Sequence, residues 1–239
     1  MAILFSPTGQ DVERYRLLRT ANVKLSQRIL ETVPKQAWDE IGSAFGALRN
    51  GVLVLDNHGI MSVIADCLLY NWLQDGKNVV EQFASTHVME PGSDEDILLR
   101  GCLSAKYRIL EVQSAEPGAG LYCKDLQRPC ELFLMDAVMS KHSPKGYSFA
   151  TRTVPIEEYW ITGGAAMPID QATRVDTAYE QLQRDYPHLL AEKDGMVLAI
   201  VRACLADGVG GRVRYESPEI MPVKPPRVGH LPPKKFRRR

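Results

Sequence analysis

Two groups of side chains are of the types that enzymes use for acid, base or nucleophilic chemistry. His58 stands two residues after Asp56, between an asparagine and a glycine, so an imidazole and a carboxylate are close together. The same pattern is also typical of a tight turn that holds a left-handed residue. Asp136, Ser140 and His142 are the residue types of a catalytic triad, but no nucleophile-elbow sequence surrounds the serine. Neither group predicts an active site by itself.

The cysteines and glycines show no pattern of a metal or phosphate site. The five cysteines are an odd number without a Cys-x-x-Cys pair, which is typical of buried thiols in a reducing compartment. Cys123 and Cys130 could contribute to a zinc site, but their spacing and the lack of a second ligand pair speak against it. The Gly-rich segments 118–120 and 208–211 lack the spacing of a phosphate loop. We therefore expect no metal and no cofactor.

Aromatic residues in the middle of the chain suggest a binding surface as another kind of site. Tyr147, Tyr159 and Trp160 could stack on the bases of a single-stranded nucleic acid. Aromatic residues in strands mostly pack in the core, however, and the neighbouring glutamates at 157 and 158 repel phosphate. A pocket between strands and helices is the alternative location, and its first candidates are His58, Asp56, Arg152 and Trp160.

The C-terminal segment 224–239 is strongly basic and holds no acidic residue. The remaining 223 residues keep 22 of the 29 basic residues against all 29 acidic ones, a net charge of −7. A cluster of this kind is attracted to a polyanion by counterion release, and it could equally be a solvated tail that folds back on its own acidic body. The predicted contacts to RNA, the ribosome or an acidic protein are Lys224, Arg227, Lys234, Lys235, Arg237, Arg238 and Arg239.

Five short apolar runs between residues 107 and 162 are separated by Gly, Pro and polar residues. Such spacing is typical of the strands of a meander or a small barrel. In the run 121–126, alternation places Leu121, Cys123 and Asp125 on one face of the strand. A barrel of about 50–60 residues rarely has enough core alone, so we expect helices to cover its open side.

Helical periodicity supplies those helices on both sides of the strands. The sequence predicts helices over 11–33, 38–45, 60–73, 79–85, 94–106, 171–186 and 192–206, and a strand over 51–56. We therefore predict an α+β fold, with a small antiparallel β-barrel or curled sheet flanked by N- and C-terminal helices. The predicted parts are a mainly helical 1–106 with one strand, a barrel or meander at 107–170, C-terminal helices at 171–215 that pack on it, and a Pro-rich basic disordered tail at 216–239.

Four segments resemble a group of uncharacterised bacterial proteins. They are the Gly-Val-Leu-Val-Leu-Asp run at 51–56, the Asp-x-x-x-Tyr core of a helix at 66–70, the Asp-Gly-Lys-Asn-Val-Val-Glu run at 75–81, and the region 107–126 with its Pro-Gly-Ala-Gly and Lys-Asp-Leu sequences. Such proteins often end in a SEC-C motif, the zinc-binding tail that is also found on the preprotein translocase ATPase. Here Val228-Gly229 and Lys234-Lys235-Phe236 match the motif, but its cysteines are absent and only His230 could bind zinc. The resemblance therefore implies a shortened remnant without the zinc function.

These observations lead to three hypotheses about function. The first is a non-enzymatic cytoplasmic interaction protein whose basic tail docks on RNA, the ribosome or an acidic protein. The second is an enzyme or a small-ligand-binding protein with a pocket between barrel and helices, and the third is a self-assembling structural subunit. The cytoplasmic location is expected because the sequence shows no signal peptide and no apolar run of about 18–20 residues. The sequence alone does not indicate an oligomeric state.

Overall fold

The computed structural model describes residues 5–49, 52–53, 58–164, 166–169, 173–190 and 195–206. The α+β class with a small barrel and flanking helices is confirmed. The helices before the barrel are α1 (Gly9–Leu30), α2 (Lys35–Ala44), α3 (His58–Asn71), α4 (Val79–Thr86) and α5 (Asp94–Leu103); those after it are α6 (Val175–Asp185), α7 (Pro187–Leu190) and α8 (Gly195–Ala206). None of them is long and apolar enough to cross a bilayer, as far as the described ranges go.

The barrel is formed by β5 (Lys106–Glu116), β6 (Gly120–Asp125), β7 (Glu131–Met135), β8 (Ser148–Ile156) and β9 (Tyr159–Thr162). The strand order β8-β5-β6-β7-β9 closes on itself because β9 also pairs with β8. The short strand β10 (Met167–Pro168) pairs with the first half of β8, outside the ring. The pair β7–β9 is parallel, whereas every other pair in this sheet is antiparallel.

This connectivity is a Greek key rather than a meander. The fourth barrel strand, β8, returns to lie beside the first, β5, and the fifth, β9, closes the gap between β8 and β7. A five-stranded Greek-key barrel of this kind is the architecture of the OB-fold, whose members bind oligonucleotides or oligosaccharides. The likeness concerns architecture only, and function has to be argued from the site.

Strand alternation separates two apolar clusters, one inside the barrel and one outside it. The predicted face of β6 is correct, because Leu121, Cys123 and Asp125 are all buried in the interior. The interior cluster is Leu110, Val112, Leu121, Cys123, Leu132, Leu134 and Phe149. Outward-facing residues of the same strands, such as Phe133, Ala150 and Val154, belong to the larger cluster that the helices share.

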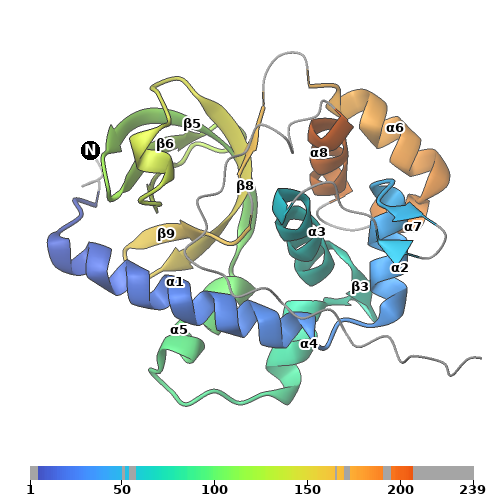
Figure 1. The fold of residues 1–239 in the computed structure, drawn as a ribbon, viewed down its shortest axis with the longest axis horizontal. Helices are drawn as coiled ribbons and strands as arrows, with labels where there is room; N and C mark the ends of the chain where they lie inside the picture. Colours follow the sequence, from blue (N-terminus) through green and yellow to red (C-terminus); the bar gives the residue numbers. More distant parts are fainter. Residues whose placement is uncertain are drawn as a thin grey trace, which may run out of the picture.

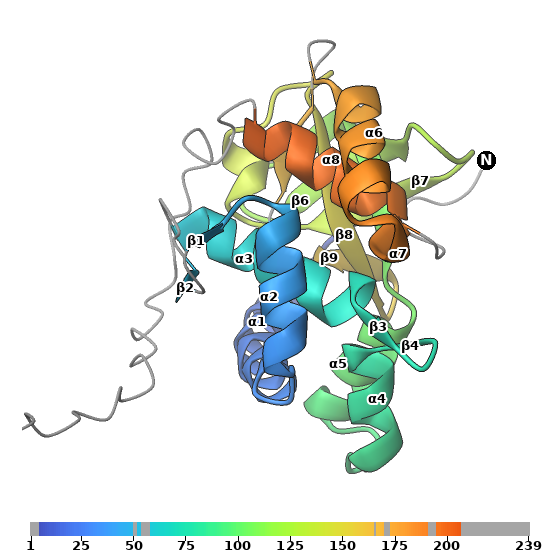
Figure 2. The same ribbon diagram turned by 90° about the vertical axis from the view of Figure 1, so that its right-hand side faces the viewer.

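The helices lie on one side of the barrel and along its base (Figure 1). Helices α3 and α8 pack on each other, α6 lies on α8, and α1 runs beneath both the barrel and the helical part. The view at 90° shows α2, α6 and α8 as a layer in front of the strands (Figure 2). The barrel therefore buries its outer wall against helices from both ends of the chain.

One helix before the barrel ends earlier than predicted, and one predicted strand is described only in part. Of the strand predicted at 51–56, Val52–Leu53 is observed as β2, which pairs with β1 (Leu48–Arg49), and the rest lies outside the described residues. The helix predicted to reach residue 106 ends at Leu103, and Lys106 already pairs with β8 as the first residue of β5. A second short hairpin, β3 (Leu73–Gln74) with β4 (Lys77–Asn78), lies between α3 and α4.

A buried ion pair joins the barrel to the helical layer. Arg152 of β8 is 1% exposed, and its Nε lies 3.0 Å from both carboxylate oxygens of Asp66 on α3. Its Nη2 donates to Asn71 Oδ1 at 2.9 Å, and its Cζ lies 4.1 Å from the centre of the Tyr70 ring. Burial disfavours the charge, but Asp66 and its neighbours outweigh this and raise the pKa of Arg152. The guanidinium is therefore a fixed, charged connection between the two layers.

Helix α5 approaches β8 closely because it presents a glycine there. A Cβ added at Gly101 would lie 2.6 Å from the carbonyl oxygen of Pro155 and 2.9 Å from Cγ1 of Val154. Both neighbours belong to a strand that is paired on both edges, so it has little freedom to move. The absence of a side chain at Gly101 is thus a condition for docking α5 on the barrel.

We expect Gly101→Ala to lower the free energy of unfolding by about 1–3 kcal/mol, because overpacking forces backbone shifts in a close-packed region. Gly9→Ala is the matched control, since nothing lies within 4 Å of a Cβ at the first residue of α1. That control should leave stability unchanged or raise it by roughly 0.5–1 kcal/mol. Urea denaturation measures both, and equal midpoints for the two variants would contradict the close packing of α5.

We expect Asp66→Ala to cost about 3–5 kcal/mol, because it leaves the guanidinium of Arg152 buried without its carboxylate. The double variant Arg152→Met, Asp66→Leu should cost less than Asp66→Ala, since it leaves no orphaned charge. Asp39→Ala breaks the exposed pair with Lys35 and should change stability by roughly 0.5 kcal/mol or less. A double variant that is less stable than Asp66→Ala would show that the pair itself stabilises the fold.

Candidate functional site

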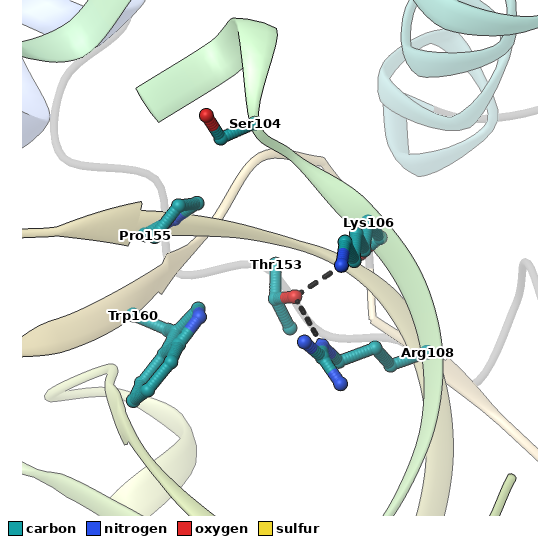
Figure 3. A pocket seen from close by; sticks show the side chains of 6 residues that line it. All are labelled: Ser104, Lys106, Arg108, Thr153, Pro155 and Trp160. Atoms are coloured by element: carbon teal, nitrogen blue, oxygen red, sulfur yellow. Dashed lines mark hydrogen bonds between the residues drawn. The ribbon is translucent and has the colours of Figure 1, made fainter. Parts of the chain in front are cut away.

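A pocket of about 460 Å³ opens at one end of the barrel, and we call it the mouth. It is lined by the α5–β5 junction and by the ends of β5, β8 and β9 that meet there (Figure 3). In the close-up, Trp160 lies on one side, Arg108 on the other, and Thr153 between them. The lining residues are Ser104, Lys106, Arg108, Thr153, Pro155 and Trp160. The mouth is thus the polar end of an otherwise apolar barrel interior.

Alternation along β5 and β6 places an ion pair at the inner end of the mouth. Arg108 Nη1 lies 2.5 Å from Oδ2 of Asp125, whose side chain is fully buried. Arg108 Nε donates to Thr153 Oγ1 at 3.0 Å, and this hydroxyl donates in turn to the carbonyl oxygen of Lys106. The other Asp125 oxygen accepts from the amide of Gln127 at 2.9 Å. The guanidinium is therefore held rigidly, with one side bonded to the barrel wall.

Positive charge exceeds negative charge at the mouth. Lys106 is exposed, and within the described ranges its ammonium forms no hydrogen bond or ion pair. Arg128 does not line the pocket, but its Nη1 lies 3.6 Å from the same Asp125 oxygen that Arg108 contacts, so it belongs to the same charge cluster. Lys106, Arg108 and Arg128 carry three positive charges and Asp125 one negative charge, which leaves a local charge of +2. A pocket with this balance favours an anionic ligand.

Among the described residues, the side chains that line the mouth include no carboxylate, imidazole or thiol. Its lining side chains are two cations, two hydroxyls, a proline and a tryptophan. Cys123 lies in the interior cluster of the barrel, and burial raises the pKa of its thiol to about 12, which keeps it protonated and unreactive. No group of three or more metal-ligating side chains occurs within the part of the chain that the structure describes. The lining thus offers positive charge and hydrogen-bond donors to a ligand.

The outer aromatic face of the barrel, by contrast, is covered by the chain's own N-terminal residues. The Phe5 ring lies 5.4 Å from both Phe133 and Tyr159, and Tyr122 packs edge-on against Phe133. Helix α1 continues this cover, because Arg19 donates to the carbonyl oxygen of Thr162 at 2.6 Å. Strands two and three of an OB-fold usually present this outer face to their ligand. Here the equivalent strands, β6 and β7, meet residues of the same chain.

The predicted site residues fall into different parts of the molecule. Trp160 lies in the mouth, whereas Arg152 points out of the barrel to the ion pair with Asp66, so the two do not share a pocket. His58 begins α3, and nothing is described of its side chain; Asp56 lies outside the described residues. The seven basic residues of the tail also lie outside them.

The suggested stacking and triad residues have structural contacts. Tyr159 is 2% exposed and packs under Phe5, and Tyr147 packs on Phe149 at the barrel interior. Ser140 Oγ accepts from the amide of Gly118 and donates to the carbonyl of Ala137. No hydrogen bond joins Ser140 to His142 or to Asp136 through their side chains in the described part of the chain. These residues stabilise turns and the core.

Sequence reasoning did not identify Lys106 or Arg108. The sequence predicts a helix that extends to Lys106, whereas the observed α5 ends at Leu103 and Lys106 is the first residue of β5. The available signal was the alternation Lys106, Arg108, Leu110, which puts two cations on the same side of β5 as the barrel core. A cation on the strand face that points into the barrel needs an ion-pair partner or an anionic ligand. This alternation of cations with core residues can be read from the sequence.

Comparison with known proteins identifies a family but no activity. A family model described as a family of unknown function (DUF7986) matches residues 9–192, which is more than half of the chain. The match includes all five barrel strands and every residue that lines the mouth, and it ends before the basic tail, so it gives no support to a SEC-C motif. No curated protein and no solved structure matches the chain. The chain therefore belongs to the family of unknown function DUF7986.

Proposed function

We propose that this protein binds a small anionic ligand in the mouth of its barrel. The observation that carries the proposal is the surplus of positive charge there, with the Lys106 ammonium free of protein partners among the described residues and the Arg108 guanidinium fixed beside it. A volume of about 460 Å³ lies within the ~300–1,000 Å³ range of small-molecule pockets. The pocket is built on paired strands, so it is largely formed before a ligand arrives.

This proposal moves the small-ligand hypothesis to a different place. The sequence placed the pocket between barrel and helices, where Arg152 is instead saturated by Asp66 and Asn71. The mouth lies on the other face of the same strand, where Thr153 rather than Arg152 faces the ligand. Because no carboxylate, imidazole or thiol lines the mouth and the Thr153 hydroxyl is bonded to Arg108 and to the Lys106 carbonyl, we propose a binding function and not catalysis.

The charge at the mouth predicts that pyrophosphate binds and that Lys106→Ala weakens its binding about tenfold, since a hydrogen bond to a charged group is worth roughly 1.5–3 kcal/mol. Lys106 is preferred to Arg108 as the target, because truncating Arg108 would orphan the buried Asp125. Isothermal titration calorimetry on the full chain at low salt measures the affinity.

Lys124→Ala is the matched control. Lys124 is also an exposed barrel lysine, but it lies on the outer face of β6 in register with Glu111 and Glu131. Its removal should leave the affinity for pyrophosphate unchanged. If Lys106→Ala and Lys124→Ala behave alike, or if pyrophosphate does not bind, the mouth is not an anion site.

The basic tail supports a second candidate, docking on RNA. Seven basic residues and no acid in residues 224–239 favour a polyanion, and they follow a body of net charge −7. This second proposal also covers the residues that resemble a SEC-C motif, which are Val228-Gly229 and Lys234-Lys235-Phe236. Because the zinc-binding cysteines are absent, such a tail would act through its charge and not through a metal.

We expect a chain that ends at Val223 to lose most of its affinity for single-stranded RNA, measured by fluorescence anisotropy at low and at moderate salt. A full-length variant with Gln in place of Lys234, Lys235, Arg237, Arg238 and Arg239 keeps the length and removes the charge. It should behave like the truncated chain, and the RNA affinity of the natural chain should fall steeply with salt. Equal RNA affinity of the natural chain, the truncated chain and the Gln variant would show that the tail does not bind RNA.

A further inference from the structure

We propose that the ligand of the mouth is a nucleotide, with its base on Trp160 and its phosphate between Lys106 and Arg108. This inference rests on the proposed function and adds the chemical class of the ligand. It follows from three properties that occur together: a partly exposed indole in the mouth, a charge of +2 on its cations and the adjoining Arg128–Asp125 pair, and a volume of about 460 Å³, which is in the range of small-molecule pockets. The indole argues against a purely inorganic anion, and the charge argues against a single carboxylate.

The indole indicates that the ligand carries a planar ring. Trp160 is half-buried, and it packs against the interior cluster of the barrel, opposite Pro155 on β8 and Leu134 on β7. Its remaining surface lines the mouth, across from Arg108 (Figure 3). An aromatic ring held by paired strands is a preformed stacking surface, which any nucleic-acid base can use. A purely inorganic anion would leave this surface exposed.

The charge balance indicates a phosphate rather than a carboxylate. Lys106, Arg108 and Arg128 against Asp125 leave a charge of +2. A phosphate monoester carries roughly −1.5 to −2 at neutral pH and neutralises this surplus, whereas a carboxylate would leave one positive charge unmatched. The Ser104 and Thr153 hydroxyls also line the pocket and can bond to phosphate or sugar oxygens.

Acidic residues near the mouth do not cancel this surplus. Glu157 points to α1, where it lies 3.7 Å from Arg14. Glu158 is exposed at the turn before β9 and, among the described residues, forms no ion pair with Lys106, Arg108 or Arg128. The mouth is open on one side, so the nucleotide could be a free mononucleotide or the phosphorylated end of a single strand. Both sources present the same base and phosphate.

The test compares adenosine 5′-monophosphate with its two halves, adenosine and ribose 5-phosphate, on the full chain. Quenching of tryptophan fluorescence and calorimetry measure binding. We expect the nucleotide to bind about tenfold more tightly than ribose 5-phosphate, because stacking adds to the phosphate contact. Trp160→Leu should remove this difference and the quenching, whereas Lys106→Ala should weaken the nucleotide and ribose 5-phosphate alike. Trp38→Phe, a half-buried tryptophan on α2, is the control and should keep both signals.

The outcomes separate this inference from the proposed function. If ribose 5-phosphate binds as tightly as the nucleotide and Trp160→Leu changes neither, the anion site stands and the nucleotide inference is overturned. If neither phosphate binds, both are overturned. Competition by a short oligoribonucleotide that depends on its 5′-phosphate supports the end of a strand as the source, and its absence, with the nucleotide bound, supports a free mononucleotide.

Discussion

The buried ion pair between Arg152 and Asp66 is the interaction on which the rest of the structure depends. It joins β8 of the barrel to α3 of the helical layer, in a place where neither charge could remain without the other. The next residue along β8 is Thr153, which points inward and holds Arg108 at the mouth. Adjacent residues of one strand therefore fix the helices on the outside and orient the cation on the inside. The residue that docks the helical layer and the residue that orients Arg108 are thus neighbours on β8.

The cover on the outer wall of the barrel limits where a ligand can bind. An isolated five-stranded barrel of this topology would present the aromatic residues of β6, β7 and β9 to solvent. In this chain Phe5 and α1 bury that face, and Arg14 and Arg19 connect α1 to the β8–β9 turn and to the end of β9. The open end of the barrel is not covered in this way. The N-terminal helix thus explains why a barrel with this architecture presents a pocket at its mouth.

Local sequence patterns were sufficient for the strands and for most helices, because alternation and turn residues act over a few positions. They correctly placed Leu121, Cys123 and Asp125 on one face of β6, which the structure shows to be the interior face. They could not show that β9 runs parallel to β7, since this pairing joins residues 26 positions apart, such as Leu134 and Trp160. They also could not show that Arg152 faces Asp66, because the side of a strand that meets a helix depends on tertiary packing. The sequence did not predict the mouth because its helical pattern extended to Lys106, which is in fact the first residue of β5.

Salt dependence connects the electrostatics of the mouth with those of the tail. The surplus at the mouth is about two charges, whereas the tail holds seven basic residues and the remaining chain a net charge of −7. For single-stranded nucleic acid the logarithm of the affinity falls by roughly 0.7 per neutralised phosphate for each tenfold increase in salt. A ligand held only at the mouth should therefore show a shallow dependence, and one held by the whole tail a steep one. If a strand end entered the mouth while the tail followed its backbone, the two contributions would add, and substituting Lys106 would reduce the steep slope by about one neutralised charge.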